Sequence, residues 1–144
     1  MDANVYFSGT MNPEGGSGYV LRLACEQRFF RIVTSQYVVG EASRNISIKL
    51  SPQHIGRFKE ILALCNPELY SLLRDPVYDP KLARTINPKD LPVLSAAIES
   101  GSEYLVTLDR KHFFMPDVIR YASKEGTSIV TPKDFLESIV KRVG

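Results

Sequence analysis

The sequence is poor in the features that most quickly narrow the class of a protein. It has two cysteines in 144 residues, and it has no run of about eighteen apolar residues that could cross a bilayer. Its first residues carry neither a basic head nor an apolar signal segment, so we expect a cytoplasmic protein without a membrane partner. Cys25 and Cys65 each lie in an apolar stretch with helical spacing, which favours two buried free thiols over a disulfide.

The excess of one sign of charge over the other is also small. The formal net charge is +2, which is too small to indicate a nucleic-acid-binding protein by itself. Arg44, Arg110 and Lys111 are among the basic residues that could line a path for a polyanion, and a solvated surface explains them equally well. The glycine-rich residues 15–18 lack the Lys-Ser/Thr ending of a phosphate-binding loop, so we expect a mobile loop over residues 8–18.

What the sequence does contain is an alternation of helical and extended patterns. Helices are predicted over residues 19–26, 36–49, 52–66, 91–100, 117–124 and 132–142, with further helical turns over 67–73. Strands are predicted over 29–34, 104–107 and 128–130, with a loop over 75–80 and a short extended piece over 82–86. This order predicts one α/β domain over residues 1–144, with three layers (α/β/α) and a mostly parallel central sheet.

The stretch from Asp90 to Phe113 organises the rest of the interpretation. Asp90 opens a helix of small apolar residues that Gly101 ends, and a short strand leads directly to Asp109. In open parallel sheets, ligand-binding groups gather beyond the carboxyl ends of the strands. We therefore expect the carboxylates of Asp90 and Asp109 at the same edge of the sheet.

Asp2 and Glu41 are the other candidate acids. Glu41 falls on the apolar face of the helix over residues 36–49, where an unpaired carboxylate is expensive unless it binds a cation. Each acid also has an ordinary explanation. Asp2 can be a solvated terminal residue, Glu41 can pair with a buried base, and Asp90 and Asp109 can be helix caps.

The four acids and their neighbours resemble the PIN-domain family. Asp2-Ala3-Asn4-Val5 resembles the family's opening Asp-Thr-Asn motif, and Ser35 through Glu41 looks like its second motif, a helix that begins with Ser and carries a Glu. Asn87 through Ala97 is similar to the third, in which an Asp opens an alanine-rich helix. Tyr104 through Asp109 resembles the fourth, which ends in Thr-x-Asp. Ile129 through Phe135 looks like the close of one prokaryotic subfamily of PIN-like ribonucleases.

This resemblance implies a metal-dependent endoribonuclease that leaves a 5′-phosphate and a 3′-hydroxyl. It implies Asp2, Asp90 and Asp109 as ligands of Mg²⁺ or Mn²⁺, with Glu41 as a further ligand or the group that positions the attacking water. Asn4 and Thr107 would hold the ligands by hydrogen bonds. Oxygen ligands suit these hard cations, and a bound cation relieves the repulsion of crowded carboxylates. His54 and His112 are expected to be solvated or core residues.

The resemblance also implies partners: an RNA substrate, a second copy of the chain in a homo-oligomer, and, for a toxin of a toxin–antitoxin pair, a small antitoxin protein. One feature departs from the family pattern. A strand usually precedes the first Asp, whereas here a single residue does, so the first strand looks truncated. The start of the sequence could be misplaced or shortened, residues 3–7 could form that strand, or another chain could supply it. This departure favours an alternative function, a catalytically weak module that binds RNA or protein.

Overall fold

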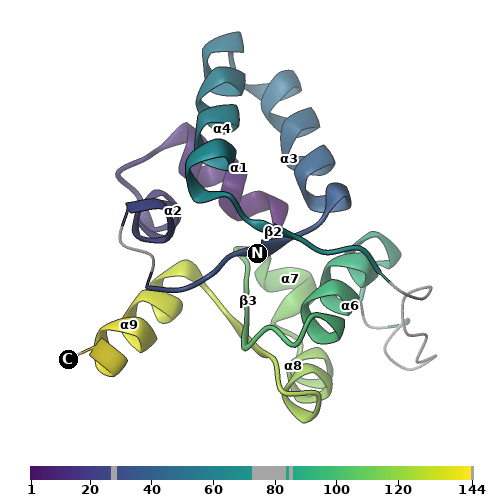
Figure 1. Ribbon diagram of the computed structural model, residues 1–144. Helices are drawn as coiled ribbons and strands as arrows, with labels where there is room; N and C mark the ends of the chain where they lie inside the picture. The colour runs from purple at the N-terminus through teal and green to yellow at the C-terminus, as the bar shows by residue number, and fades with distance from the viewer. Residues whose placement is uncertain (27–28, 73–83, 85, 144) are drawn as a thin grey trace.

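The chain folds into helices that surround two short parallel pairs of strands (Figure 1). The computed structural model describes residues 1–26, 29–72, 84 and 86–143. Its first half contains α1 (Ala3–Met11), α2 (Gly16–Glu26), β1 (Val33–Thr34), α3 (Gln36–Lys49), α4 (Pro52–Cys65) and β2 (Glu68–Leu69). Its second half contains the 3₁₀ turn η1 (Pro88–Asp90), α6 (Leu91–Glu99), β3 (Tyr104–Val106), α7 (Arg110–Phe113), α8 (Pro116–Lys124), β4 (Ser128–Val130) and α9 (Pro132–Val143).

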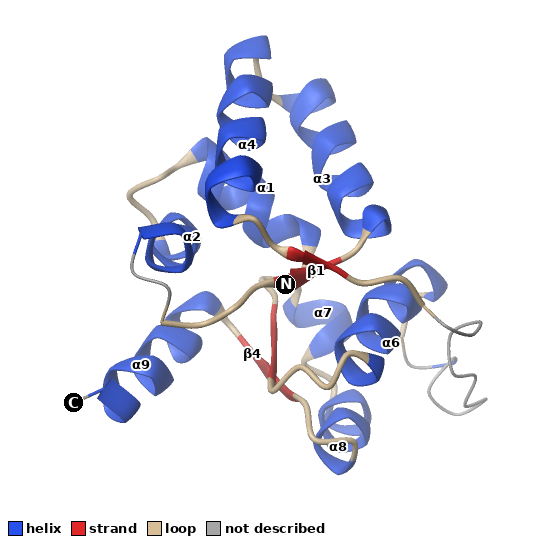
Figure 2. Cartoon of the chain, in the orientation of Figure 1, coloured by secondary structure: helices blue, strands red, loops and turns tan. Residues whose placement is uncertain are grey.

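The strands confirm the predicted α/β class and the parallel pairing. β1 pairs with β2 so that Val33 lies opposite Glu68, and β3 pairs with β4 so that Leu105 lies opposite Ile129. Figure 2 shows these strands at the centre of the molecule, with α1, α3 and α4 on one side and α6, α7 and α8 on the other. β4 has the predicted bounds 128–130, and β3 ends one residue before the predicted 107. β1 is much shorter than predicted, because only the last two residues of the expected 29–34 strand pair in a ladder.

The N-terminal residues lie between the two strand pairs. The Met1 amino group donates to the Val33 carbonyl oxygen at 3.3 Å, and the Asp2 N–H donates to the Val106 carbonyl oxygen at 3.0 Å. Met1 and Asp2 thus occupy the position of a strand between β1 and β3. The chain then turns at once into α1, so residues 3–7 are helical and do not supply the missing strand.

The expectation of a mobile loop over residues 8–18 is wrong. Most of this stretch belongs to α1 and α2, joined by the short turn at 12–15. Its glycines permit close packing: a Cβ on Gly18 would collide with the Pro13 carbonyl, and a Cβ on Gly9 would collide with the Leu21 side chain. A glycine-rich segment can form a loop or can allow two helices to pack closely, and the composition is the same in both cases. Composition alone therefore could not distinguish them.

Several predicted helix boundaries are confirmed by their capping groups. Ser35 caps α3, where its side-chain oxygen accepts from the Val38 N–H at 3.2 Å. Gly101 has a φ of 71° just after α6, and Gly126 has a φ of 88° just after α8. The described part of the predicted turns over 67–73, residues 67–72, is not a helix. The Glu68 N–H donates to the Ile32 carbonyl oxygen at the start of β2. Residues 75–80 and most of 82–86 lie outside the described residues.

The core joins the inner faces of these helices to the strands. Its fully buried large side chains include Tyr6, Ile46, Ile86, Leu94, Leu105 and Phe113. Val38, Ala42 and Ile46 form the buried stripe of α3, and they leave Glu41 beside that stripe, half-buried. Among the described residues, none of the helices is both long enough and apolar enough to span a bilayer.

The expected free thiols are replaced by a disulfide. Cys25 near the end of α2 is bonded to Cys65 at the end of α4, with 4.2 Å between their Cα atoms. The two helices pack against each other at these positions. That contact joins residues 40 apart in sequence, so helical periodicity could not reveal it.

We expect reduction of the Cys25–Cys65 disulfide to lower the free energy of unfolding by about 3–4 kcal/mol, because the bond closes a loop of roughly 40 residues in the unfolded chain. Denaturant unfolding with and without reductant measures this. The double variant Cys25→Ala/Cys65→Ala should match the reduced protein and should not respond to reductant. Two titratable thiols in the unreduced, unfolded wild-type chain would show that the bond is absent.

Candidate metal centre

Asp90 is a buried carboxylate whose side chain does not cap the helix that follows it. It lies at the junction of η1 and α6, at the N-cap position, but its side chain makes no capping hydrogen bond. The residue is 5% exposed, and its Oδ2 has no hydrogen-bond partner among the described residues. A buried polar atom is nearly always paired, so an unpaired one marks a place where a ligand can bind. The capping explanation for Asp90 therefore accounts for its position and not for its side chain.

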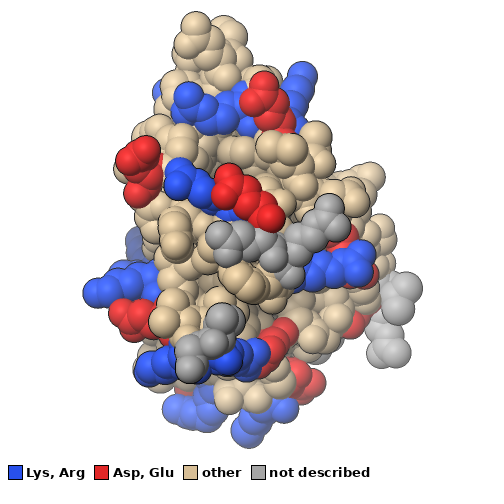
Figure 3. Space-filling view, turned by 60° about the vertical axis from the view of Figure 1, so that its left-hand side comes forward, with Lys and Arg blue, Asp and Glu red and all other residues tan. Residues whose placement is uncertain are grey.

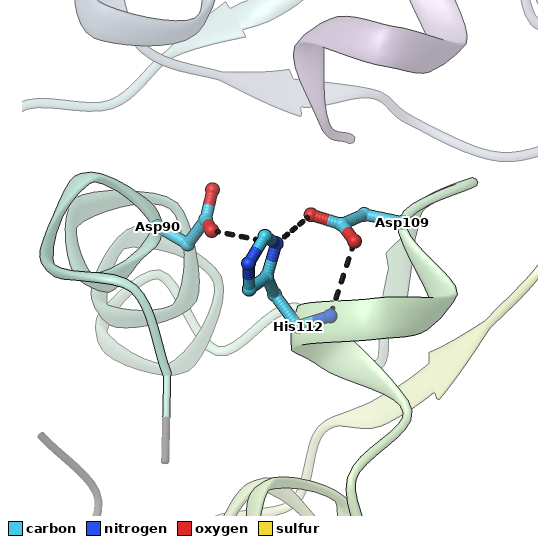
Figure 4. Close-up of side chains that lie close together, drawn as sticks. All are labelled: Asp90, Asp109 and His112. Carbon is cyan, nitrogen blue, oxygen red and sulfur yellow. Dashed lines mark hydrogen bonds and ion pairs between the residues drawn. The ribbon is translucent and has the colours of Figure 1, made fainter. Parts of the chain in front are cut away.

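Asp109 and His112 face Asp90 from the short helix α7 (Figure 4). Asp109 caps this helix, where its Oδ1 accepts from the His112 N–H at 3.1 Å. Its Oδ2 lies 2.8 Å from the His112 Nδ1, which in turn lies 3.6 Å from the Asp90 Oδ2. His112 is thus neither a solvated nor a core residue, contrary to expectation. The sequence feature that indicates this role is its position three residues after Asp109, because residues three apart lie on the same side of a helix.

Asp2 is held beside this group by a network that ends at β3. The Thr107 hydroxyl donates to the Asp2 Oδ2 at 2.7 Å, and the Asn4 side-chain amide donates to the same oxygen at 3.1 Å. Thr107 also accepts from the Asp109 N–H at 3.0 Å, and the Asn4 Oδ1 accepts from the Leu108 N–H at 3.1 Å. Asn4 and Thr107 therefore fix the carboxylate of Asp2 relative to the backbone that carries Asp109.

Glu41 approaches from α3, and Tyr37 joins that helix to the loop of Asp90. The Tyr37 hydroxyl, one turn before Glu41, donates to the Lys89 carbonyl oxygen at 2.7 Å. Burial, Glu41 and Asp90 each raise the pKa of the Tyr37 hydroxyl, which means that both carboxylates lie near it. This hydrogen bond joins residues 52 apart in the sequence, so no local pattern predicted it.

The carboxyl pKa values show a crowded, partly dehydrated group of acids. Burial, then the charges of Asp2 and Asp109, raises the pKa of Asp90 to about 6. Burial is also the main cause of the raised pKa of Asp2, which its hydrogen bonds to Thr107 and Ala3 oppose. Burial and the charge of Asp2 raise the pKa of Glu41, against the opposing charges of Lys89 and Arg44. Groups that perturb one another in this way are typical of functional sites.

The structure divides the predicted site residues into a compact group and its surroundings. Oxygen or nitrogen atoms of Asp90, Asp109 and His112 lie within 4.8 Å of one another, close enough to bind one cation. Asp2 and Glu41 are outside that group. The charge of Asp2 raises the pKa of Asp90 within the group and the pKa of Glu41 beside it. The basic residues Arg44, Arg110 and Lys111 are exposed, one turn from Glu41 and directly after Asp109.

The fold and the site together define a class of protein: an α/β protein with a carboxylate-rich centre suited to a divalent cation. A family model described as a PIN domain matches residues 1–111, so the chain belongs to the PIN-domain family. The match includes Asp2, Glu41, Asp90 and Asp109 and ends one residue before His112. Neither the curated proteins nor the solved structures contain a match to the chain.

We expect Asp90→Asn to raise the free energy of unfolding by about 1–3 kcal/mol near pH 7 in the presence of a chelator. In the folded protein the Asp90 pKa is about 6, against 3.8 as its ordinary value, so the folded state binds more protons between these values. Stability that depends on this carboxyl therefore falls as the pH rises through that interval. The gain from Asp90→Asn should accordingly vanish towards pH ~4.

Denaturant unfolding across this pH range measures the effect. Asp117→Asn on α8 is the matched control, because Asp117 is partly exposed and forms an ion pair only with Arg120 among the interactions described. Its free energy of unfolding should change little at either end of the range. An equal gain for Asp90→Asn at both ends would contradict the burial of a costly charge.

Proposed function

We propose that the protein is a metal-dependent endoribonuclease that hydrolyses RNA phosphodiester bonds. The observation that carries this proposal is the buried Asp90 Oδ2, which accepts no hydrogen bond among the described residues and faces Asp109 and His112. A carboxylate in that position is unfavourable in the apo protein and favourable beside a cation. Membership of the PIN-domain family supports nuclease chemistry at this place.

In this proposal Asp90 and Asp109 hold Mg²⁺ or Mn²⁺, with Asp2 as a third carboxylate ligand. His112 either supplies a nitrogen ligand or holds Asp109 in place; a nitrogen ligand would favour Mn²⁺ over Mg²⁺. The bound cation would lower the pKa of a coordinated water and balance the charge that develops on the phosphodiester. Thr107 and Asn4 restrict the Asp2 carboxylate to one orientation, which favours tight binding of the ion.

Glu41 is proposed as the group that positions the attacking water and accepts its proton. Burial and the charge of Asp2 raise the pKa of Glu41, which makes it a better base than an ordinary glutamate. It belongs to α3, whereas Asp90 and Asp109 belong to the opposite group of elements. The Tyr37–Lys89 hydrogen bond keeps these two parts of the site in register.

Arg44, Arg110 and Lys111 are proposed to bind the RNA backbone around the site. They are exposed, and each lies within three residues of a proposed catalytic acid. Elsewhere the surface is mixed: the face in Figure 3 carries acidic and basic side chains side by side. RNA would therefore be attracted by a few local contacts rather than by the net charge of +2.

The remaining parts of the proposal come from the family resemblance. They are a homo-oligomer and the role of toxin with an antitoxin protein as partner. Isolation of the protein from its native host, followed by mass determination of the complex and identification of bound RNA and protein, tests them together. A catalytically weak module that binds RNA or protein is the alternative.

We expect Asp90→Asn and Asp109→Asn each to lower kcat/KM for cleavage of a single-stranded RNA at least 100-fold in Mg²⁺ or Mn²⁺. Glu41→Gln should lower kcat with little change in KM, because it leaves the metal ligands intact. Asp117→Asn should retain wild-type activity. Equal activity of Asp109→Asn and wild type would exclude this centre as the catalytic site, and no metal-dependent cleavage by any variant or the wild type would favour the binding module.

We expect Arg44→Ala, Arg110→Ala and Lys111→Ala each to weaken RNA binding and to reduce the slope of log affinity against log salt by about 0.7, because each removes about one phosphate contact. Lys59→Ala, on the exposed side of α4, should change neither quantity. Filter binding in a chelator at several salt concentrations measures binding apart from cleavage. Unchanged slopes for all three site variants would contradict their proposed contacts.

A further inference from the structure

Tyr37 is an aromatic side chain at the border of the metal centre. It lies in the first turn of α3, one turn before Glu41, and residues four apart lie on the same face of a helix. Its hydroxyl donates at 2.7 Å to the carbonyl oxygen of Lys89, the residue that precedes Asp90. The ring therefore bridges α3, which carries Glu41, and η1, which carries Asp90.

The Tyr37 ring is held at both ends and is still accessible to a ligand. Its Cβ is fixed by α3 and its hydroxyl by the hydrogen bond to η1, so both side-chain torsions are set before a ligand binds. The residue is nevertheless 40% exposed. A fixed and exposed ring offers apolar area to a ligand, and little further side-chain entropy is lost when the ligand binds.

Exposure alone does not distinguish Tyr37 from other aromatic residues. Tyr19 on α2 is 48% exposed, and Figure 1 shows α2 on the other side of the molecule from α6, the helix that follows Asp90. Tyr37 differs in its position. Burial, then the charges of Glu41 and Asp90, raises the pKa of its hydroxyl, so both carboxylates lie close to it. Tyr37 is thus an exposed aromatic ring beside two of the proposed catalytic acids.

One face of α3 carries an aromatic ring, a carboxylate and a guanidinium in that order. Tyr37, Glu41 and Arg44 follow the spacing i, i+4, i+7, so they lie along one stripe of the helix. At a rise of 1.5 Å per residue, Tyr37 lies about 6 Å along the axis before Glu41 and Arg44 about 4.5 Å after it. This order suits a nucleobase, a phosphodiester with its attacking water, and a flanking phosphate of one RNA strand.

An unpaired nucleobase is the ligand that best suits the Tyr37 ring. The proposed function puts a phosphodiester at the metal centre, so the base of an adjoining nucleotide lies beside this ring. Bases of single-stranded RNA stack on exposed aromatic side chains. In a duplex, the neighbouring base pairs cover both faces of each base, and the ring could not contact them.

We propose that Tyr37 stacks against an unpaired nucleobase of the RNA, next to the phosphodiester at the metal centre, and that this contact selects unpaired purines at that position. The inference rests on the proposed function and adds a residue that determines specificity. Purines are favoured because their larger ring system covers more of the tyrosine ring. The Tyr37 hydroxyl has a separate role, which is to hold α3 against η1.

Binding is tested first, in a chelator, so that cleavage plays no part. The ligands are a nine-nucleotide oligoadenylate and an abasic oligomer of the same length and charge. We expect Tyr37→Leu to bind the oligoadenylate about fivefold or more weakly than wild type, because one stacked base is lost, and to bind the abasic oligomer equally well. Tyr37→Phe keeps the ring and should bind both oligomers within about twofold of wild type. Tyr19→Leu is the matched control and should bind both as wild type does.

The distribution of cleavage then locates the stacked base. In an oligouridylate with one central adenosine, wild type should cleave preferentially at a bond beside the adenosine. An abasic nucleotide at that place, or Tyr37→Leu, should remove the preference. Tyr37→Phe should slow cleavage and keep the preference, and Tyr19→Leu should leave both unchanged. Loss of a purely structural contact would instead slow cleavage at every bond alike.

Three results would overturn the proposal: equal losses of affinity for both oligomers in Tyr37→Leu, equal losses in Tyr37→Phe and Tyr37→Leu, or no loss. Metal-dependent cleavage whose distribution Tyr37→Leu leaves unchanged would also overturn it, while the nuclease function would stand. A selective loss for the oligoadenylate, without cleavage by any variant or the wild type, would support the stacking contact and reject the nuclease function.

Discussion

The structure of the site depends on the hydrogen bond from the Thr107 hydroxyl to the Asp2 carboxylate. This 2.7 Å contact joins the N-terminus to the end of β3, and Thr107 also accepts from the Asp109 N–H. One side chain thereby sets the relative positions of two acids that are more than a hundred residues apart. Asn4 adds a second donor to Asp2, so the carboxylate has little freedom to turn away from the centre.

Around that contact, the fold gathers negative charge that it does not neutralise internally. Asp90 is buried and its Oδ2 accepts no hydrogen bond among the described residues, with the His112 ring 3.6 Å away. The charge of Asp2 raises the pKa values of both Asp90 and Glu41. His112, Lys89 and Arg44 compensate only in part. A fold selected for stability alone would not bury a carboxylate in this way, because an apolar residue at Asp90 would cost less. A divalent cation bound among these carboxylates would compensate the excess negative charge.

Local patterns in the sequence predicted the structure correctly wherever a single residue sets the backbone conformation beside it. Ser35, Gly101 and Gly126 marked helix ends correctly, and the parallel α/β class followed from the order of elements. The errors all concern contacts between distant segments. Gly9 and Gly18 serve helix packing, Cys25 is bonded to Cys65, and residues 68–70 extend along β1 instead of forming helical turns. His112 was missed because its importance depends on Asp90 across the site.

By itself the sequence determined which acids are available and on which elements they lie, because caps, turns and periodicity act within a few residues. Only the tertiary structure decided that Asp90 and Asp109 share one centre with His112 while Asp2 and Glu41 border it. It also decided that two residues stand between β1 and β3. Such outcomes depend on the packing of segments that are far apart in the sequence. No local pattern encodes the distances between them.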